Sequence, residues 1–436
     1  MRHDAAIPQR PSNRHTAATG HAGPLGLAAV LLLAAGQGAP AAAQDSETEG
    51  GGPEKVARGR VIVTSPDAKL QIADRPPRPV PTGRILDYSR TNGAWLWVDE
   101  LWGWVDSKSV MLLPEAEASY TKALSDAEAD EKALPGETFQ PAGDLTAEQQ
   151  RDRKAAAIRT AKSIALHQRG IVRYAAGRPG EAVEDFDAAI AGGYKLPNVH
   201  INRGNALLAN GDFDAAVEAI TEAIAIDPRS ARGYYSRAAA LITKDFFEAA
   251  LGDADKAVEL DPNAARHWYI KGQAERSLGK FAEAVKSFNE AIKLSPRYVE
   301  ALTNRGYSLK RLGRLEQAAK DYRQAIEVDP ELAVSRNDLA WLLATTKDEG
   351  LRDAEEAVTL AEAAVELAGG EAGADLPESE VGQYYDTLAA AYAAAQSWED
   401  AEKAARKAVE LLDGADQFAA DERLTMYLNK KPYVEK

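Results

Sequence analysis

The sequence predicts a mainly α-helical solenoid preceded by a small all-β barrel. Small residues and prolines return every 34 residues through the C-terminal part of the chain, whereas short runs of alternating apolar residues fill positions 56–113. Alanine is abundant and aromatic residues make up only 7% of the chain, a composition that favours closely packed helices. We therefore divide the chain into segments 1–43, 44–55, 56–113, 114–154, 155–413 and 414–436.

Composition and charge limit the classes of function. The chain has 436 residues, of which 45% are hydrophobic and 27% charged, as in ordinary globular proteins. Its formal net charge of -15 argues against broad nucleic-acid binding, which requires a positive surface to neutralise phosphates. Cysteine is absent, so disulfides, thiolate zinc sites and cysteine nucleophiles are excluded. We expect no nucleic-acid partner.

Residues 1–43 have the order of residues found in a secretory signal peptide. Three arginines precede an apolar run from Leu25 to Ala35, and small residues follow up to Ala43. The apolar run is too short to span a bilayer comfortably. We predict cleavage after Ala43 and export to the bacterial periplasm or cell envelope. The alternative is an uncleaved N-terminal anchor, the only arrangement that would place the chain at a membrane. Residues 44–55 are small and polar and predict a flexible linker.

Residues 56–113 alternate apolar and polar side chains in short runs separated by turn residues, which predicts five or six strands and a small barrel. We expect a tight hairpin at Val98–Leu101. The stretch NGAWLWVDELWGWVDSKSV resembles the bacterial Src-homology-3-like domain. The resemblance rests on the strand from Trp95 to Val98, on Gly103-Trp104-Val105 and on the last strand near Val110.

Four tryptophans alternate along two strands of this segment and are expected to share one face of the sheet. They are Trp95, Trp97, Trp102 and Trp104, and Leu96, Val98 and Val105 would then point into the barrel. One interpretation is that the tryptophan face packs against neighbouring helices or completes a small core. The other is an exposed aromatic patch that binds a peptide or a cell-wall glycan.

Residues 114–154 predict a helical connector. A helix is expected near 114–133 and a loop near 135–144, and Thr146 with Gln149 three residues later predicts a capping box that opens the next helix. Ala116, Tyr120 and Ala123 lie on one face of the first of these helices. Their spacing matches the second helices of the downstream repeats, so this helix is a candidate half repeat that caps the N-terminal end of the array.

The remaining chain repeats with a period of 34 residues. Gly170, Gly204, Ala238, Gly272 and Gly306 hold this spacing, as do Ala182, Ala216, Ala250, Ala284 and Ala318, and Pro228, Pro262, Pro296 and Pro330. This pattern resembles the tetratricopeptide repeat (TPR), which implies about seven helix pairs in a right-handed superhelix. We expect an insertion at Thr345–Arg352 in the sixth unit, and a C-terminal helix within 414–436 that caps the array.

A basic residue also recurs every 34 residues on the predicted first helices. Three of these residues have an acid 16 positions later, in the pairs Arg169 and Asp185, Arg237 and Asp253, and Arg305 and Asp321. Arg203 has Ala219 at that position and Lys271 has Ser287. We predict that the row forms ion pairs between helices, each contributing up to about 1 kcal/mol if exposed. Arg203 and Lys271 have no predicted acidic partner, and Arg203 is the member for which the structural interpretation is weakest.

The resemblance implies that the first helices line a concave groove, which gives the candidate site for a partner. The groove positions selected are Asn198, Ile201, Asn205, Arg232, Tyr235, Arg266, Tyr269, Gln273, Arg276, Tyr307, Lys310 and Arg311. They are basic and aromatic in an acidic protein, which suits the carboxylates of an acidic peptide, because arginine offers paired donors and tyrosine offers flat contact area. The alternative is a solvated inner wall whose charges only maintain solubility.

Catalytic motifs are missing from the sequence. It has no phosphate loop, no dinucleotide fingerprint and no nucleophile elbow. His167, His200 and His267 lack histidine partners at helical spacing, so we expect no metal site, no cofactor and no enzyme activity. The predicted function is a non-catalytic protein-protein interaction scaffold that binds a peptide or protein in the concave groove. The alternative is a cell-wall or glycan-binding module in which the repeats serve as a spacer.

Overall fold

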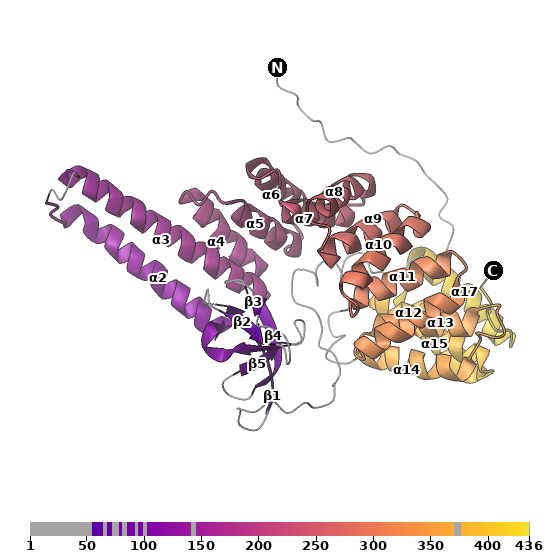
Figure 1. Ribbon diagram of the computed structural model, residues 1–436. Coiled ribbons are helices and arrows are strands. Elements are labelled where there is room, and N and C mark those ends of the chain that lie inside the picture. Colours follow the sequence, from indigo (N-terminus) through magenta and orange to yellow (C-terminus); the bar gives the residue numbers. More distant parts are fainter. Residues whose placement is uncertain are drawn as a thin grey trace, which may run out of the picture.

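A β-sheet followed by a long series of helices makes up the computed structural model (Figure 1). The structure describes residues 55–63, 68–71, 78–80, 85–91, 95–98, 103–140, 145–369 and 376–435. The predicted signal peptide, its cleavage site after Ala43 and nearly all of the predicted linker lie outside these residues. So do Trp102 and the turn of the predicted hairpin.

The described strands form one antiparallel sheet in the order β3-β2-β6-β5-β4-β1-β7. They are β1 (Lys55–Val63), β2 (Lys69–Gln71), β3 (Arg78–Pro79), β4 (Ile85–Thr91), β5 (Trp95–Val98), β6 (Gly103–Asp106) and β7 (Val110–Leu112). Strands β5 and β6 pair antiparallel with Val98 opposite Gly103, whereas the predicted tight hairpin at Val98–Leu101 would place Val98 opposite Leu101, so the strands are joined by a longer connection than predicted. Within the described residues, β3 and β7 are the two edges of the sheet.

Over Val61–Val63 both faces of β1 are buried, because successive side chains point into two different cores. Val61 and Val63 join Val98 and Val105 in the core of the sheet, where Leu96 is also partly buried. Ile62, between them, packs with residues of the following helices. The inward direction predicted for Leu96, Val98 and Val105 is therefore confirmed. In the β5–β6 register Trp97 stands directly opposite Trp104.

Two long helices connect the sheet to the repeats and pack against each other. Helix α2 (Leu113–Ala133) leads through the short 3-10 helix η3 (Leu134–Gly136) to α3 (Ala147–Ala175). The predicted capping box at the start of α3 is confirmed, because Thr146 and Gln149 each accept a hydrogen bond from the other's backbone N–H. Arg60 Nη1 donates to the carbonyl oxygen of Ala175 at 2.7 Å and ties the sheet to the end of α3.

Within residues 147–411 the helices form seven successive pairs, each helix packed against its neighbours in sequence. The pairs begin with α3 and α4 (Pro179–Ala191), α5 (Pro197–Ala209) and α6 (Phe213–Ile226), and α7 (Ala231–Thr243) and α8 (Phe247–Leu260). They continue with α9 (Ala265–Ser277) and α10 (Phe281–Leu294), α11 (Val299–Arg311) and α12 (Leu315–Val328), α13 (Ala333–Thr345) and α14 (Ala354–Gly369), and α15 (Glu378–Ala394) and α16 (Trp398–Leu411). In Figure 1 the N-terminal pairs lie at the opposite end of the array from α17 (Gly414–Leu428).

The recurring glycine lets the two helices of one pair touch. A Cβ atom at Gly272 would lie 2.6 Å from the ring of Phe288, and one at Gly306 would lie 2.8 Å from the ring of Tyr322. These rings are fully buried. The unit with Ala238 has the small Ala254 at the aromatic position, so there a methyl group fits. Residue size is therefore matched between the two helices of a pair.

The C-terminal end departs from the regular repeat in two places. Between α13 and α14 the chain forms the longer predicted loop, and both Arg352 Nε and Arg352 Nη2 donate to the carbonyl oxygen of Thr346. Helix α17 packs on α16 and α15 as the predicted cap. Residues 431–435 then turn back to α13, a contact that the repeat pattern did not predict.

Candidate partner-binding groove

The basic residue that recurs on the first helices forms ion pairs, as predicted. In three repeats the arginine donates two hydrogen bonds to the acid 16 residues later, at distances from 2.6 to 2.9 Å. The pairs are Arg169 with Asp185, Arg237 with Asp253, and Arg305 with Asp321. All three carboxylates are buried, so these pairs join the two helices of a repeat.

Arg203 and Lys271 also pair with acids, contrary to the expectation for Arg203. Arg203 Nε donates to Asp187 at 2.5 Å, and Lys271 Nζ lies 2.7 Å from Asp255. Each acid lies 16 residues before its partner, on the second helix of the preceding repeat. Counting 16 residues only toward the C-terminus from each basic residue does not reveal these two pairs. The whole row is engaged within the protein and leaves no charge free for a ligand.

The groove residues selected from sequence differ in exposure. Asn198, Arg266 and Arg311 are exposed, Asn205, Arg232, Tyr235, Arg276 and Lys310 are half-buried, and Ile201, Tyr269, Gln273 and Tyr307 are buried. Gln273 donates to the Tyr269 hydroxyl at 2.8 Å, and Tyr269 packs with Phe288 and Tyr298 between repeats. Tyr269 and Gln273 therefore lie beneath the surface that the other residues form.

The first part of the groove is a connected row of polar and aromatic groups on α3, α5, α7 and α9. Asn202 contacts His167 Nε2 at 3.1 Å and accepts a hydrogen bond from Arg232 at 2.5 Å. The Arg266 guanidinium lies 5.6 Å from the centre of the Tyr235 ring. The structure thus brings Arg232, Tyr235 and Arg266 together, and they define what we call the first cationic site.

A second cluster of cations and rings follows on α9, α10 and α11. The Arg276 guanidinium lies 5.3 Å from the centre of the Tyr307 ring, and Arg311 lies 4.6 Å from the Phe281 ring. Arg311 Nη1 also donates to the Tyr307 hydroxyl at 3.0 Å. These contacts hold the guanidiniums by their faces and leave N–H donors at their edges.

Arg232, Arg266 and Arg276 lack the carboxylate partners that the 16-residue spacing gives the arginines of the recurring row. Among the described residues, no carboxylate lies within ion-pair distance of Arg232, Arg266 or Arg276. Burial and, next, the positive charge of Arg266 lower the pKa of Arg232. Arg276 Nε is buried without a hydrogen-bond partner. A buried donor without a partner is costly, so the Nε of Arg276 is unsatisfied within the described part of the protein.

Three further groove residues were missed at the sequence level. Tyr174 shares the repeat position of Arg276, and Glu300 shares that of Arg232 and Arg266, so the same 34-residue spacing would have found both. The hydroxyls of Tyr174 and Tyr298 are buried without partners, and burial raises the pKa of both side chains. Burial also raises the pKa of Glu300, which is therefore more easily neutral than an ordinary glutamate.

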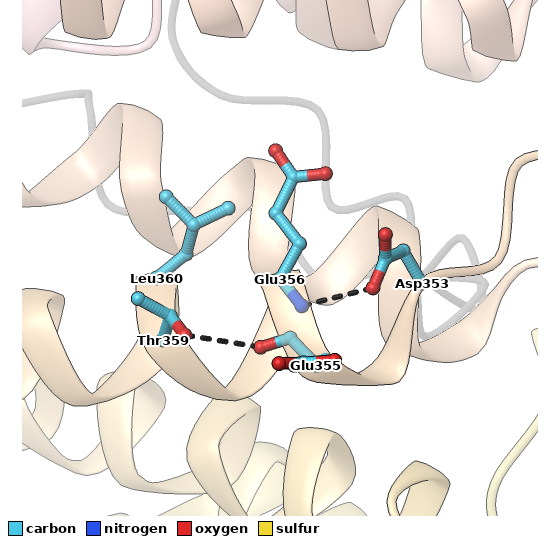
Figure 2. Close-up of a pocket in the computed structure, with 5 residues that line it drawn as sticks. All are labelled: Asp353, Glu355, Glu356, Thr359 and Leu360. Atoms are coloured by element: carbon cyan, nitrogen blue, oxygen red, sulfur yellow. Dashed lines mark hydrogen bonds between the residues drawn. The ribbon is translucent and has the colours of Figure 1, made fainter.

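A separate hollow of about 370 Å³ lies at the start of α14 and has a different character (Figure 2). Asp353, Glu355, Glu356, Thr359 and Leu360 line it. Its polar groups are largely engaged: Asp353 accepts from the Glu356 backbone N–H, and Glu356 pairs with Arg323 at 2.7 Å. No group of three or more potential metal ligands occurs in the part of the chain that the structure describes. Over the same residues, no helix has the length and apolar character needed to cross a membrane.

Family models identify the repeats. A TPR repeat model matches residues 272–313, and tetratricopeptide repeat models match residues 299–332, 167–231 and 201–262. The matched segments run from the last turns of α3 to just past the end of α12 with a gap at residues 263–271, and they contain Arg232, Tyr235 and the second cationic cluster, whereas Arg266 lies in the gap. The chain therefore carries tetratricopeptide repeats, as its 34-residue period predicted. No curated protein sequence matches the chain.

Solved structures that are similar to part of this chain include two that are described as TPR proteins and one of MamA. A thermophilic TPR protein of Thermus thermophilus is 23% identical over 46% of this chain and 98% of its own, with a TM-score of 0.36. YrrB, described as a TPR protein with an unusual peptide-binding site, is 21% identical over 43% of this chain and 95% of its own, with a TM-score of 0.35. MamA of Desulfovibrio magneticus is 20% identical over 38% and 95%, with a TM-score of 0.35.

Proposed function

We propose that the protein is a non-catalytic interaction scaffold whose concave groove binds an acidic segment of a protein or peptide partner. The observation that carries this proposal is the set of three groove arginines, Arg232, Arg266 and Arg276, that have no acidic partner among the described residues. The arginines of the row at Arg169, Arg237 and Arg305 are all held by carboxylates. Ion pairing within the fold therefore explains the arginines of the row but does not explain the three groove arginines.

Electrostatics favours an anionic ligand at the first cationic site. Two guanidiniums whose charges repel each other share this part of the groove, and one of them is desolvated. A carboxylate placed between them gains two charge-assisted interactions in a region of reduced screening. The neighbouring rings of Tyr235 and Tyr307 supply flat apolar area for the rest of a bound segment. The combination suits a peptide that has both acidic and apolar residues.

The proposal is tested by affinity capture from an envelope extract of the source organism. The intact protein is compared with a variant that carries R232Q, R266Q and R276Q. A control variant carries K286Q, K320Q and K403Q, which remove the same charge from exposed positions on the second helices α10, α12 and α16. We expect the intact and control proteins to retain one partner that the groove variant loses. Equal capture by all three proteins would overturn the role of the groove.

Export and a Src-homology-3-like barrel at the N-terminus are proposed on the sequence pattern alone. The order of residues 1–43 supports export, and the pairing of Trp97 with Trp104 in the antiparallel register agrees with the Trp-containing hairpin of such domains. Cell fractionation followed by mass measurement of the mature chain tests export and cleavage after Ala43. Recognition of a glycan by the tryptophans remains a prediction from sequence.

A further inference from the structure

Residues 431–435, which follow the cap helix α17, fold back onto α13 and occupy a defined set of contacts there. The backbone N–H of Glu435 donates to the carbonyl oxygen of Thr345 at 2.8 Å. Trp341 Nε1 donates to the Glu435 carboxylate at 3.3 Å, across 94 residues of sequence. This segment has no helical or strand structure, so it binds as an irregular peptide and not as part of a regular element.

The contacted surface takes the same repeat position on α13 as the candidate groove residues take on the preceding first helices. Trp341 lies 34 residues after Tyr307, the groove residue that carries the second cationic cluster. Both positions are on first helices, α11 and α13. The returning segment therefore lies on the side of the array where the proposed partner binds, but on the C-terminal repeats and not at Arg232, Arg266 and Arg276.

The site is formed by Trp341 and Arg423, which we call the aromatic and cationic frame. Tyr433 packs with its ring centre 5.8 Å from that of Trp341 and 5.6 Å from the Arg423 guanidinium. Arg423 also lies over the Trp341 ring at 5.5 Å. Asp386 holds Arg423 in place through two hydrogen bonds of 2.9 and 2.7 Å, and both residues of this pair are buried. The orientation of the frame is thus fixed by α15 and α17.

We propose that this frame is a peptide-binding site for a segment with an aromatic residue followed two positions later by an acid, and that residues 433–435 are its resident occupant. The aromatic ring packs between Trp341 and Arg423, the acid accepts from the indole N–H, and the segment's backbone N–H donates to Thr345. A partner with the same pattern gains access only by displacing the chain's own segment. This site goes beyond the proposed acidic-segment groove and does not depend on it.

The connection between α17 and Tyr433 is short, which explains how a few weak contacts keep residues 433–435 bound at the site. Only four residues separate the end of α17 at Leu428 from Tyr433. A short tether holds its segment at an effective concentration on the order of millimolar. A free peptide of equal intrinsic affinity at micromolar concentration therefore loses the competition. Removal of the resident contacts should expose the site to binding in trans.

The test uses the full chain and a labelled peptide, Leu-Asn-Lys-Lys-Pro-Tyr-Val-Glu-Lys, that copies residues 428–436. Fluorescence anisotropy is measured with the intact protein and with a full-length variant that carries Y433S and E435Q. We expect the variant to bind the peptide at least tenfold more tightly than the intact protein does. A control peptide with serine and glutamine at the tyrosine and glutamate positions should not bind to either protein.

Two further variants locate the interaction. Adding W341F to the double variant removes the indole N–H while keeping a ring, and should weaken peptide binding severalfold. Adding R232Q, R266Q and R276Q should leave it unchanged, which separates this site from the proposed function. The proposal is overturned if the double variant keeps the helical circular dichroism of the intact protein and yet binds no peptide. It is also overturned if intact protein and double variant bind with equal affinity.

Discussion

The two halves of the concave face differ in how their charges are compensated. In the N-terminal half, Arg232 and Arg266 lie beside tyrosine rings with no carboxylate partner among the described residues. In the C-terminal half, the buried Arg423 is held by Asp386, and the chain's own Tyr433 and Glu435 cover the surface. One scaffold therefore presents a cationic surface without carboxylate partners and a second surface that is covered by the chain's own residues.

The difference shows which arginines serve the fold and which are left for a partner. The arginines of the recurring row have a carboxylate 16 residues away on a neighbouring helix, and the buried Arg423 has one across α15 and α17. Arg232, Arg266 and Arg276 have no such carboxylate partner among the described residues. A desolvated charge without a carboxylate partner, such as that of Arg232, is costly to the fold, which supports the proposal that it serves a partner.

The largest loss of stability is expected when the ion pair between Arg423 and Asp386 in the C-terminal half is removed. D386A leaves the buried Arg423 guanidinium without its carboxylate, and we expect a loss of about 3–5 kcal/mol in the free energy of unfolding. Urea denaturation followed by circular dichroism measures it. The matched control is D187A, which removes the exposed partner of Arg203 and should cost less than about 1 kcal/mol. Equal losses in both variants would contradict the distinction between buried and exposed pairs.

A pH dependence is expected from His167 in the N-terminal half. Burial and, next, the charge of Arg232 lower the pKa of His167 to about 4 from its ordinary 6.5. The unfolded chain therefore takes up a proton near pH 6.5, whereas the folded protein does so only near pH 4. Stability falls as the pH is lowered through this window, by on the order of 2 kcal/mol for this residue.

The variant H167Q isolates this contribution. Urea midpoints at pH 7 and pH 4.5 are compared for the intact protein and the variant. Carboxyl groups with raised pKa, such as Glu300, titrate in both proteins and cancel in the difference. We expect the variant to lose less stability on acidification than the intact protein. An identical loss in both would show that His167 is readily protonated in the fold.

A small effect of opposite sign is expected from Arg232. R232Q removes a desolvated charge and keeps a side-chain amide that can donate to Asn202. We expect stability to stay the same or to rise by up to about 1 kcal/mol. Thermal unfolding at pH 7 measures it. A clear destabilisation would mean that the charged hydrogen bond from Arg232 to Asn202 stabilises the fold and would weaken the functional interpretation of the groove.

Much of the fold could be predicted because its determinants are local. The 34-residue period, the capping box at Thr146 and the forward pairs such as Arg305 with Asp321 depend on short, fixed spacings. The partner of Arg203 was missed because it lies in the preceding repeat. The return of Glu435 to Trp341 was missed because no local pattern encodes a contact between residues so far apart in sequence. At the candidate site, the spacing selected the right helices but did not distinguish the buried Tyr269 from the exposed Arg266.

The central claim, that the N-terminal half of the groove binds acidic segments, is tested most directly with a defined probe. A fluorescein-labelled peptide of ten residues rich in glutamate is titrated with the intact protein, with the R232Q, R266Q and R276Q variant, and with the K286Q, K320Q and K403Q control. We predict that the groove variant binds at least tenfold more weakly than the other two and that rising salt weakens the binding of the intact protein. Equal affinities for all three proteins would contradict the claim.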